Sequence, residues 1–361
     1  MKKFMVVSGF LGAGKTTTMM ALADHLCNND VKTKIIANDL GARNIVDTKF
    51  TELSGADVTE LTGECICYQT ENLVDRLRRL FDYEKADFVM SDIPGCGIGA
   101  LEHVYYKLDD EYHNEFDMAP FLVVTDPVRL RAIMPEHKDL NLPEEMNFLF
   151  RAQLAEADVV VLNKADLLTA EEVENFKAFL TDFCPGIPVF AISAKEGTGI
   201  KELADHLLSA AARLERFDIG YGSPEFIAAE QKLCWYNRQF YVSNDEGFDG
   251  NEFARDMLNA IRDELKDIGR NVPHLKLFAE TEDGDVCKMS LLGVDYGIEE
   301  DRLLRNKCAG LSVILNARAV CESQTLSNMM DIVLAQMIEK YNFICNIFFT
   351  ESFGMMDKGR I

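Results

Sequence analysis

The chain has 361 residues, of which 48% are hydrophobic and 27% charged, and its formal net charge is −23. This composition is typical of a soluble globular protein with a full core and room for at least two domains. The acidic balance argues against binding to nucleic acid or to an anionic membrane, because both favour basic surfaces. No apolar stretch approaches the roughly 18 residues of a membrane span, and the ten cysteines lack regular spacing, so we expect a reducing, cytoplasmic setting.

The first predicted element is a short buried strand over Phe4–Ser8, which leads into Gly9-Phe-Leu-Gly-Ala-Gly-Lys15-Thr16. This segment matches the G-x-x-x-x-G-K-[ST] phosphate loop, whose backbone N–H groups wrap phosphates at the positive N-terminus of the next helix. We expect Lys15 to reach the β- and γ-phosphates and Thr16 to bind Mg²⁺. The other residues expected to contact the nucleotide here are Gly12, Ala13, Gly14 and Thr17.

A later hydrophobic strand ends in an aspartate, with a glycine three residues further on, in Phe88-Val-Met-Ser-Asp92-Ile-Pro-Gly95. This is the Walker B and switch II pattern. Asp92 is expected to hold Mg²⁺, and Gly95 can donate its N–H to the γ-phosphate and so sense hydrolysis. Many GTPases place Gln or His next, where this chain has Cys96. A thiol orients water poorly, so we expect slow intrinsic hydrolysis.

Two further strands are predicted over Val159–Leu162 and Ile187–Ile192, and each ends in a motif that selects the base. Asn163-Lys164-Ala165-Asp166 places a carboxylate where it accepts from the N1–H and exocyclic amine of guanine, a donor pair that adenine lacks. Ser193-Ala194-Lys195 offers a backbone contact to the guanine oxygen. The sequence therefore predicts GTP and GDP as the nucleotides. The alternative is that Asp166 merely caps the helix that follows.

Residues 1–213 are thus expected to form a P-loop GTPase domain of α/β class, with a mainly parallel sheet flanked by helices. Residues 214–231 mix charge, glycine and proline and are interpreted as a linker. In residues 232–361 the predicted elements follow approximately the order β-α-β-β-β-α-β, a smaller α+β domain that recognises a client or simply covers the first domain. Four cysteines are expected in or near its core: Cys287, Cys308, Cys321 and Cys345.

Taken together, the motifs of residues 1 to about 213 resemble the CobW-like metallochaperone GTPases, SIMIBI-class P-loop proteins related to UreG and HypB. The phosphate loop GFLGAGKTT has the form that this family uses, and Asn38-Asp39-Leu40-Gly41 is similar to its N-E-F-G motif. Asp47 stands at the position of the family's switch I aspartate. The resemblance implies that Asp39 and Asp47 contact Mg²⁺ or water, that homodimers form in response to nucleotide, and that a metal or metal cofactor is delivered to a client protein.

The cysteine signature departs from the family pattern. Where the family has G-C-x-C-C, this chain has Gly63-Glu64-Cys65-Ile66-Cys67-Tyr68, with a tyrosine at the third cysteine and a glutamate that looks like an insertion. A tetrahedral thiophilic ion such as Zn²⁺ or Co²⁺ takes about four ligands. Cys65 and Cys67 supply two and Cys96 could supply a third, with Glu64, a client or a second subunit completing the set. Alternatively, Cys65 and Cys67 are small buried residues retained from a metal-binding ancestor.

The expected function is a GTP-hydrolysing metallochaperone for a client metalloprotein. One alternative is a GTPase chaperone that loads or reactivates a corrinoid (cobalamin) protein without carrying free metal. Another is a slow GTP switch that acts as a binding module. Two histidines, His103 and His113, flank a predicted acidic helix and are expected to be solvated rather than metal ligands.

Overall fold

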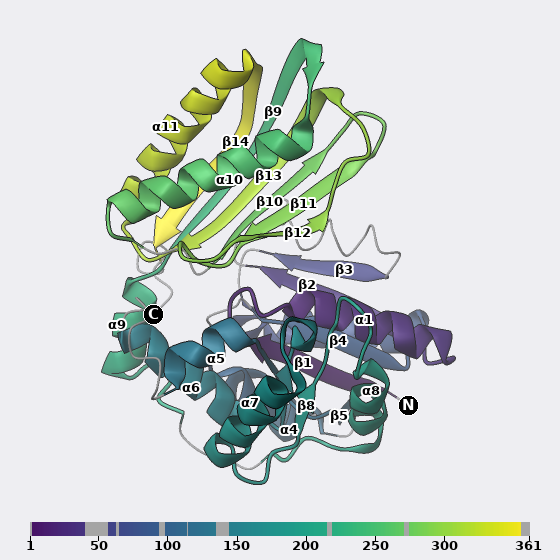
Figure 1. The fold of residues 1–361 in the computed structure, drawn as a ribbon. Coiled ribbons are helices and arrows are strands. Elements are labelled where there is room, and N and C mark those ends of the chain that lie inside the picture. The colour runs from purple at the N-terminus through teal and green to yellow at the C-terminus, as the bar shows by residue number, and fades with distance from the viewer. Residues whose placement is uncertain are drawn as a thin grey trace. The chain divides into compact units, whose positions relative to one another are not determined.

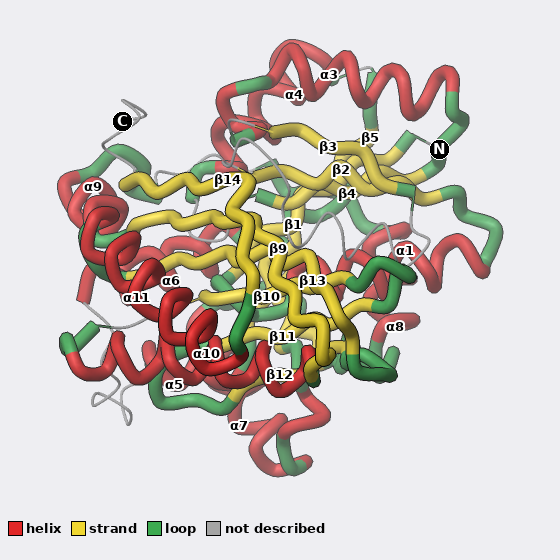
Figure 2. Tube along the Cα trace, turned by 90° about the horizontal axis from the view of Figure 1, so that it is seen from above, coloured by secondary structure: helices red, strands yellow, loops and turns green. Residues whose placement is uncertain are grey.

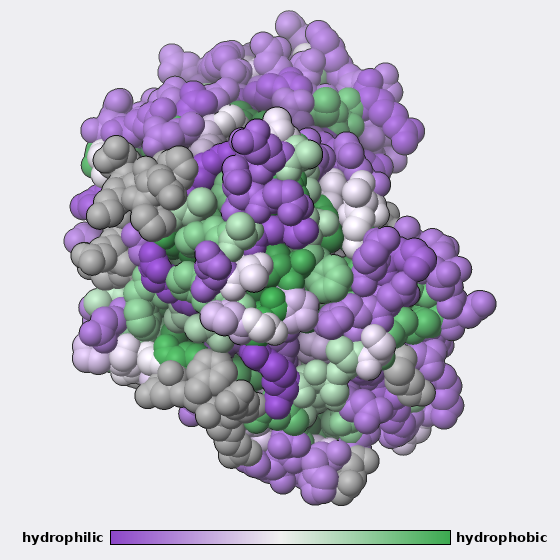
Figure 3. All heavy atoms as spheres, turned by 60° about the horizontal axis from the view of Figure 1, so that its bottom comes forward, coloured by the Kyte–Doolittle hydropathy of each residue, from purple (hydrophilic) through white to green (hydrophobic). Residues whose placement is uncertain are grey.

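The computed structural model describes residues 2–39, 57–62, 65–93, 98–113, 115–134, 144–214, 219–270 and 274–354. The chain forms two compact units, which divide between Phe226 and Ile227 (Figure 1). No helix within these ranges is both long and apolar enough to cross a membrane. On the face drawn in Figure 3, hydrophilic side chains (purple) surround smaller hydrophobic patches (green).

The first unit is built on a parallel sheet of eight described strands in the order β3-β2-β4-β1-β6-β7-β8, with β5 beside β1. The strands are β1 (Lys3–Gly9), β2 (Thr33–Asp39), β3 (Val58–Thr62), β4 (Phe88–Asp92), β5 (Asp117–Met118), β6 (Leu122–Thr125), β7 (Val159–Leu162) and β8 (Val189–Ala191). The central strands are continuous buried runs, as expected of a parallel sheet covered on both faces. Because the strands are parallel, the motifs that follow β1, β4 and β7 meet at one edge of the sheet.

Helices flank this sheet (Figure 1). They are α1 (Lys15–Asn28), α3 (Thr70–Arg78), α4 (Lys107–Tyr112), α5 (Pro127–Ile133), α6 (Glu144–Glu156), α7 (Ala170–Phe183) and α8 (Ile200–Ser209). The described part of the unit also contains two 3₁₀ turns, η1 (Ile66–Tyr68) and η5 (Ala165–Leu167), and two π-helical segments, η2 (Arg79–Tyr83) and η3 (Leu101–Tyr106). Helix α1 packs on β1, β2, β4 and α8, whereas α6 packs on β1 and β6.

The second unit is an antiparallel sheet in the order β12-β11-β10-β13-β9-β14. Its strands are β9 (Cys234–Phe248), β10 (His274–Glu280), β11 (Val286–Leu291), β12 (Ile298–Arg302), β13 (Cys308–Ala319) and β14 (Ile344–Gly354). Helices α10 (Gly250–Asp267) and α11 (Ser323–Tyr341) lie along one face of this sheet (Figures 1 and 2). Alternate strand residues such as Phe240, Leu277 and Leu315 point into the core with Phe253 and Met257 of α10.

The fold class expected from the sequence is confirmed, with three differences in detail. The second unit has one strand more than expected, because β12 (Ile-Glu-Glu-Asp-Arg) is an exposed acidic edge strand without apolar alternation. The segment interpreted as a linker contains a helix, α9 (Pro224–Gln231). The helix predicted after switch II begins as the π-helical segment η3.

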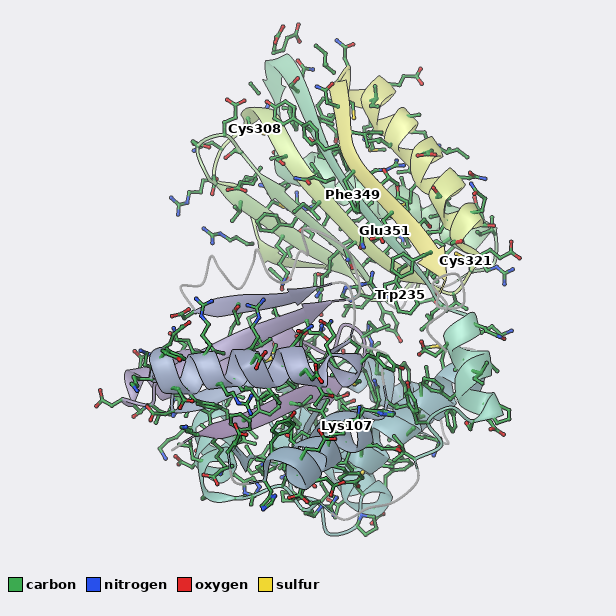
Figure 4. The ribbon with its side chains drawn as sticks, turned by 180° about the vertical axis from the view of Figure 1, so that it is seen from behind. Lys107, Trp235, Cys308, Cys321, Phe349 and Glu351 are labelled. Carbon is green, nitrogen blue, oxygen red and sulfur yellow. The ribbon has the colours of Figure 1, made fainter. Side chains whose placement is uncertain are left out.

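The cysteines of the second unit lie in or against its core, as expected. Figure 4 shows Cys308 and Cys321 at opposite ends of the sheet, with Trp235 near the second end and Phe349 and Glu351 along β14. The Cys321 thiol lies 3.6 Å from that of Cys234. Apart from this pair, the described cysteines of the unit are spread along the sheet.

Candidate nucleotide site and cysteine loop

The phosphate loop joins β1 to α1 through glycines that no other residue would replace easily. Gly9, Gly12 and Gly14 have φ angles of 137°, 75° and 92°, in the half of conformational space that side chains disfavour. Within the loop, the Lys15 ammonium donates to the carbonyl oxygens of Gly9 and Phe10 at 3.0 and 3.3 Å. The loop therefore curls around its own lysine, and Gly14 is the N-cap residue of α1, whose N-terminus favours an anion.

Asn163 connects the three nucleotide motifs to one another. Its side-chain N–H donates to the carbonyl of Ala13 at 2.8 Å, and its side-chain oxygen accepts the N–H of Ala194 at 3.0 Å. The side chain is only 3% exposed, so both hydrogen bonds are shielded from water. A Cβ on Gly14 would lie 2.4 Å from the Asn163 amide nitrogen. Asn163, the first residue of N-K-x-D, thus positions the phosphate loop and the 193–195 loop through buried hydrogen bonds.

The remaining base-selecting residues lie around this centre. Asp166 lies in η5 and is exposed, and the turn is held by the Ala165 N–H, which donates to Ile192 at 3.0 Å. Ser193 pairs with Thr198 through a backbone bond of 3.0 Å, and its hydroxyl accepts the Glu196 N–H at 3.2 Å. Lys195, next to this bridge, is exposed. The structure therefore brings the loop of N-K-x-D and the loop of S-A-K side by side.

Lys164 of the same motif faces a buried aspartate that the sequence analysis missed. Lys164 has a φ of 62° and its ammonium lies 3.7 Å from the carboxylate of Asp126. Asp126 is fully buried, caps α5 by accepting the Arg129 N–H at 2.8 Å, and pairs with the Arg129 guanidinium at 3.1 Å. The only signal for it was Thr125-Asp126-Pro127, a cap followed by proline after a buried strand.

The residues expected to hold Mg²⁺ lie at the end of β4 and in the helix that follows its neighbour β1. β1 and β4 pair with Val7 in register with Asp92, and Thr16 lies in the first turn of α1. A threonine hydroxyl and a carboxylate are hard oxygen ligands, so this donor set fits Mg²⁺. Asp92 also accepts the N–H of Asn38 at 2.9 Å.

Several expected residues cannot be placed. β2 ends at Asp39, whose side chain lies outside the description. Asp47, Glu64, Gly95 and Cys96 lie outside the described residues altogether. Their assigned roles stay predictions.

The cysteine loop, residues Cys65 to Tyr68, follows β3. The Cys65 and Cys67 sulfurs lie 3.2 Å apart, and the turn is closed by the Tyr68 N–H, which donates to the Cys65 carbonyl at 3.0 Å. The hydrogen bond with Cys65 and burial raise the pKa of the Cys67 thiol well above its usual value. Tyr68, at the family's third cysteine, is 51% exposed. Within the described residues no group of three or more His, Cys, Asp or Glu side chains is arranged to hold a metal ion.

A buried glutamate lies close enough to the cysteine loop to act on it electrostatically. Glu156, at the end of α6, is 0% exposed, and one carboxylate oxygen accepts the N–H groups of Gly99 and Leu101 at 2.8 and 3.3 Å. Burial raises its pKa to about 8. Its second oxygen is buried and has no hydrogen-bond partner among the described residues, and its ionised form helps to raise the pKa of Cys67. Glu156 therefore supports the start of the segment that follows switch II.

His103 departs from the expectation of a solvated histidine. It is half-buried, and its ring meets that of Tyr221 edge-on with centroids 4.5 Å apart. Burial lowers its pKa. The Tyr221 hydroxyl is hydrogen-bonded to that of Tyr68. Tyr221, before α9, therefore contacts both Tyr68 of the cysteine loop and His103 of η3. The prediction for His103 was wrong because the acidic pattern of its helix did not reveal these aromatic neighbours.

The fold and motifs define a P-loop nucleotide-binding domain. The chain belongs to the CobW/HypB/UreG family, whose nucleotide-binding domain matches residues 3–191. The resemblance expected from the motifs is thereby confirmed.

Curated relatives share the first half of the chain. The chain is 31% identical over 173 residues to the zinc chaperone YeiR of Escherichia coli, a match that covers 47% of this chain and 49% of YeiR. It is 28% identical over 186 residues to a zinc chaperone CobW from Sinorhizobium sp, covering 46% and 51%. The chain thus spans about half the length of the curated relatives it matches. Among solved structures, the Zn(II)-bound YjiA GTPase from E. coli aligns with 16% identity and a TM-score of 0.37, over 92% of this chain and 98% of that one.

Proposed function

We propose that this protein binds and hydrolyses GTP and couples its nucleotide state to the delivery of Zn²⁺ to a client metalloprotein. The observation that carries the proposal is the pair of thiols 3.2 Å apart on a loop whose Ile66 N–H is hydrogen-bonded to Asn38, next to Asp92. Membership of the family and the zinc chaperones among the relatives support it.

Each nucleotide-binding group has a defined task in this proposal. The loop backbone and Lys15 hold the phosphates, Thr16 and Asp92 hold Mg²⁺, and Asp166 accepts from guanine. Mg²⁺ supplies charge neutralisation at the phosphates when it is bound. Asn163 keeps the phosphate and base subsites at a fixed separation, because it bonds Ala13 and Ala194 at once.

The cysteine pair can accept a thiophilic cation in exchange for protons. Thiols bind metal as thiolates, so binding at Cys65 and Cys67 releases protons and tightens as pH rises. A raised pKa of Cys67 makes this release costly near neutral pH. Two ligands fall short of the four that Zn²⁺ prefers, which leaves positions for Cys96 and for a ligand of the client. An open site of this kind suits a protein that must give its metal away.

The remaining features of the proposal follow from the resemblance and the sequence. Cys96 replaces the usual water-orienting Gln or His, so intrinsic hydrolysis is slow and a client or metal accelerates it. We place the protein in the cytoplasm and propose a homodimer that depends on the nucleotide.

The decisive experiment is a competition titration of Zn²⁺ and a direct titration of Co²⁺, with GDP and with a non-hydrolysable GTP analogue. The Cys65→Ser/Cys67→Ser double variant is compared with Cys27→Ser, which removes an exposed cysteine on α1. We expect tight binding that changes with nucleotide, persists in Cys27→Ser and disappears in the double variant. Equal, weak binding by all three proteins would reject the proposal.

A second candidate function rests on Tyr68, which stands exposed where the family has a third thiol. In this candidate the GTPase loads or reactivates a corrinoid protein and carries no free metal. Co-purification with a corrinoid protein, together with absence of metal uptake, would favour it. Turnover stimulated by a client or metal would exclude a purely non-catalytic switch.

A further inference from the structure

We propose that Asn38 is a positioning residue that couples the binding of Mg²⁺ and nucleotide at Asp92 to the position of the cysteine loop. The inference rests on the proposed function, because it names the connection between the nucleotide site and the cargo site. Two hydrogen bonds carry it, one from the backbone and one from the side chain of the same residue.

The first bond arises from the order of the strands. β2 and β4 are parallel neighbours, with Ile36 in register with Ser91, so Asp92 at the end of β4 lies beside the residues just before the end of β2. The Asn38 N–H donates to a carboxylate oxygen of Asp92 at 2.9 Å. A hydrogen bond to an ionised carboxylate is stronger than one between neutral groups. Any change in the charge that Asp92 faces therefore acts directly on the position of Asn38.

The second bond fixes the cysteine loop to the same residue. The side-chain oxygen of Asn38 accepts the N–H of Ile66 at 3.0 Å, in the peptide that joins the two cysteines. Asn38 is 5% exposed and Ile66 is 0% exposed, so water does not compete for this bond. If this bond broke, the Ile66 N–H would be buried without its acceptor, which costs free energy. We therefore expect Ile66 to follow Asn38 when Asn38 moves.

The turn converts movement of Ile66 into movement of both sulfurs. The N–H groups of Tyr68 and Gln69 donate to the carbonyls of Cys65 and Ile66 at 3.0 and 3.1 Å. Residues 65–69 therefore move as one unit, and a change of sulfur separation or exposure alters the affinity for a cation. A contiguous chain of buried hydrogen bonds is a physical path for coupling.

A separate contact offers a rival path. Glu156 holds the N–H groups of Gly99 and Leu101, beyond switch II. Its ionised form acts on Cys67 through charge, whereas Asn38 acts on the cysteine loop through a directional bond. The two paths are distinguished by changing Asn38 alone.

The test measures how fast iodoacetamide alkylates Cys65 and Cys67 in the full chain with Mg²⁺ and either GDP or a non-hydrolysable GTP analogue. Co²⁺ affinity is measured in the same two states. The variants are Asn38→Ala, which removes the acceptor, Asn38→Asp, which keeps one, and Asn72→Ala as a matched control. Asn72 is exposed on α3 and donates to the side-chain oxygen of Gln69, next to the cysteine loop.

We expect the wild-type alkylation rates to differ between the two nucleotide states by about fivefold or more, a typical coupling. The ratio should fall to about one in Asn38→Ala, survive in Asn72→Ala and be largely restored in Asn38→Asp. If Asn38→Ala does not fold, hydrogen exchange of the Ile66 amide is measured in the wild type instead. The protection of this amide should then differ between the two nucleotide states.

Two results would overturn the inference: equal wild-type rates in both states, or a ratio that persists in Asn38→Ala. A nucleotide-dependent rate in a protein that binds no Co²⁺ or Zn²⁺ would leave Asn38 in its assigned role and reject the metal cargo. The failure of the proposed function is thus separable from the failure of the Asn38 assignment.

Discussion

Asp126 is a single buried carboxylate that serves a helix cap, an arginine and the lysine of N-K-x-D. In Asp126→Asn the amide oxygen can still cap α5, but the negative charge opposite Arg129 and Lys164 is lost. Breaking a buried ion pair costs roughly 3–5 kcal/mol. We therefore expect a loss of about 3 kcal/mol in the free energy of unfolding and GDP affinity lower by about tenfold, as measured by urea denaturation and calorimetric titration.

The matched control for this prediction is Asp205→Asn, which breaks the exposed Lys201–Asp205 pair on α8. An exposed i,i+4 pair contributes about 0.3–0.5 kcal/mol, so this variant should keep both stability and GDP affinity. Equal effects of the two substitutions would show that Asp126 has no special role in orienting Lys164.

The raised pKa of Glu156 leads to a prediction about how stability depends on pH. Its pKa is about 8 in the folded protein against 4.5 as the reference value, so between these values the folded state keeps a proton that the unfolded state has lost. The free energy of unfolding should therefore fall as pH rises through this window, by up to about 1.4 kcal/mol per unit. Glu156→Gln removes the titration and should flatten the dependence, as measured by denaturation from pH 5 to 8.

The control is Glu174→Gln, which changes an exposed glutamate on α7 and should retain the wild-type slope. Parallel pH profiles for wild type and Glu156→Gln would mean that Glu156 is ionised in the folded protein at neutral pH. Comparing differences between variants removes the contribution of the other titrating groups.

At the scale of elements, the end of β1 must fit against β6. Gly9 has a φ of 137°, and a Cβ there would lie 2.0 Å from the carbonyl oxygen of Val124, which also accepts the Phe10 N–H at 3.0 Å. Gly9→Ala thus forces two backbone segments apart at the entry to the phosphate loop. We expect loss of GDP binding and a drop in unfolding free energy of about 3 kcal/mol or more, combining strain and overpacking.

Gly222→Ala provides the comparison, because Gly222 has a φ of 73° but open space where the Cβ would lie. Gly222→Ala should lower the free energy of unfolding by only about 1–2 kcal/mol, because alanine disfavours the left-handed conformation. GDP affinity should stay unchanged. If both alanine variants bound GDP like the wild type, close packing of β1 on β6 would not shape the loop.

Elements with strong local signals could be predicted from the sequence. Helix α7 is one, because Thr169 and Glu172 form a capping box at its start; the fully apolar β7 is another. β12 could not be found, since its residues are polar and its pairing depends on β11. The burial of His103 also depends on distant aromatic residues that no local pattern reveals.

At the scale of the whole molecule, motifs identify the kinds of residue in the site, but the sheet order decides which of them meet. Asn38, Ile66 and Asp92 are joined by hydrogen bonds because β2 lies between β3 and β4. The same topology places Asn163 between the phosphate loop and Ala194. Spacing along the chain carries no information about these contacts, so the sequence could name their members but not the connections between them.

The net charge of −23 leads to a prediction about salt. Like charges repel across the compact chain, whereas the described surface ion pairs, such as Lys2–Asp82 and Lys201–Asp205, contribute at most about 1 kcal/mol each. Raising ionic strength from about 0.01 to 0.15 M shortens the Debye length from roughly 30 to 8 Å, which screens distant repulsion more than close pairing. The midpoint of the first thermal transition should therefore rise by a few degrees. For a domain of this size, each kcal/mol added to the free energy of unfolding raises the midpoint by about 2–4 °C.

Scanning calorimetry in KCl and in choline chloride checks this prediction, since screening depends on ionic strength and not on the identity of the cation. A rise in KCl alone would indicate a specific potassium site. A fall in both salts would mean that ion pairs outweigh the excess of 60 acidic over 37 basic residues. If the rise is found in both, the same long-range field concentrates cations around the molecule at low ionic strength.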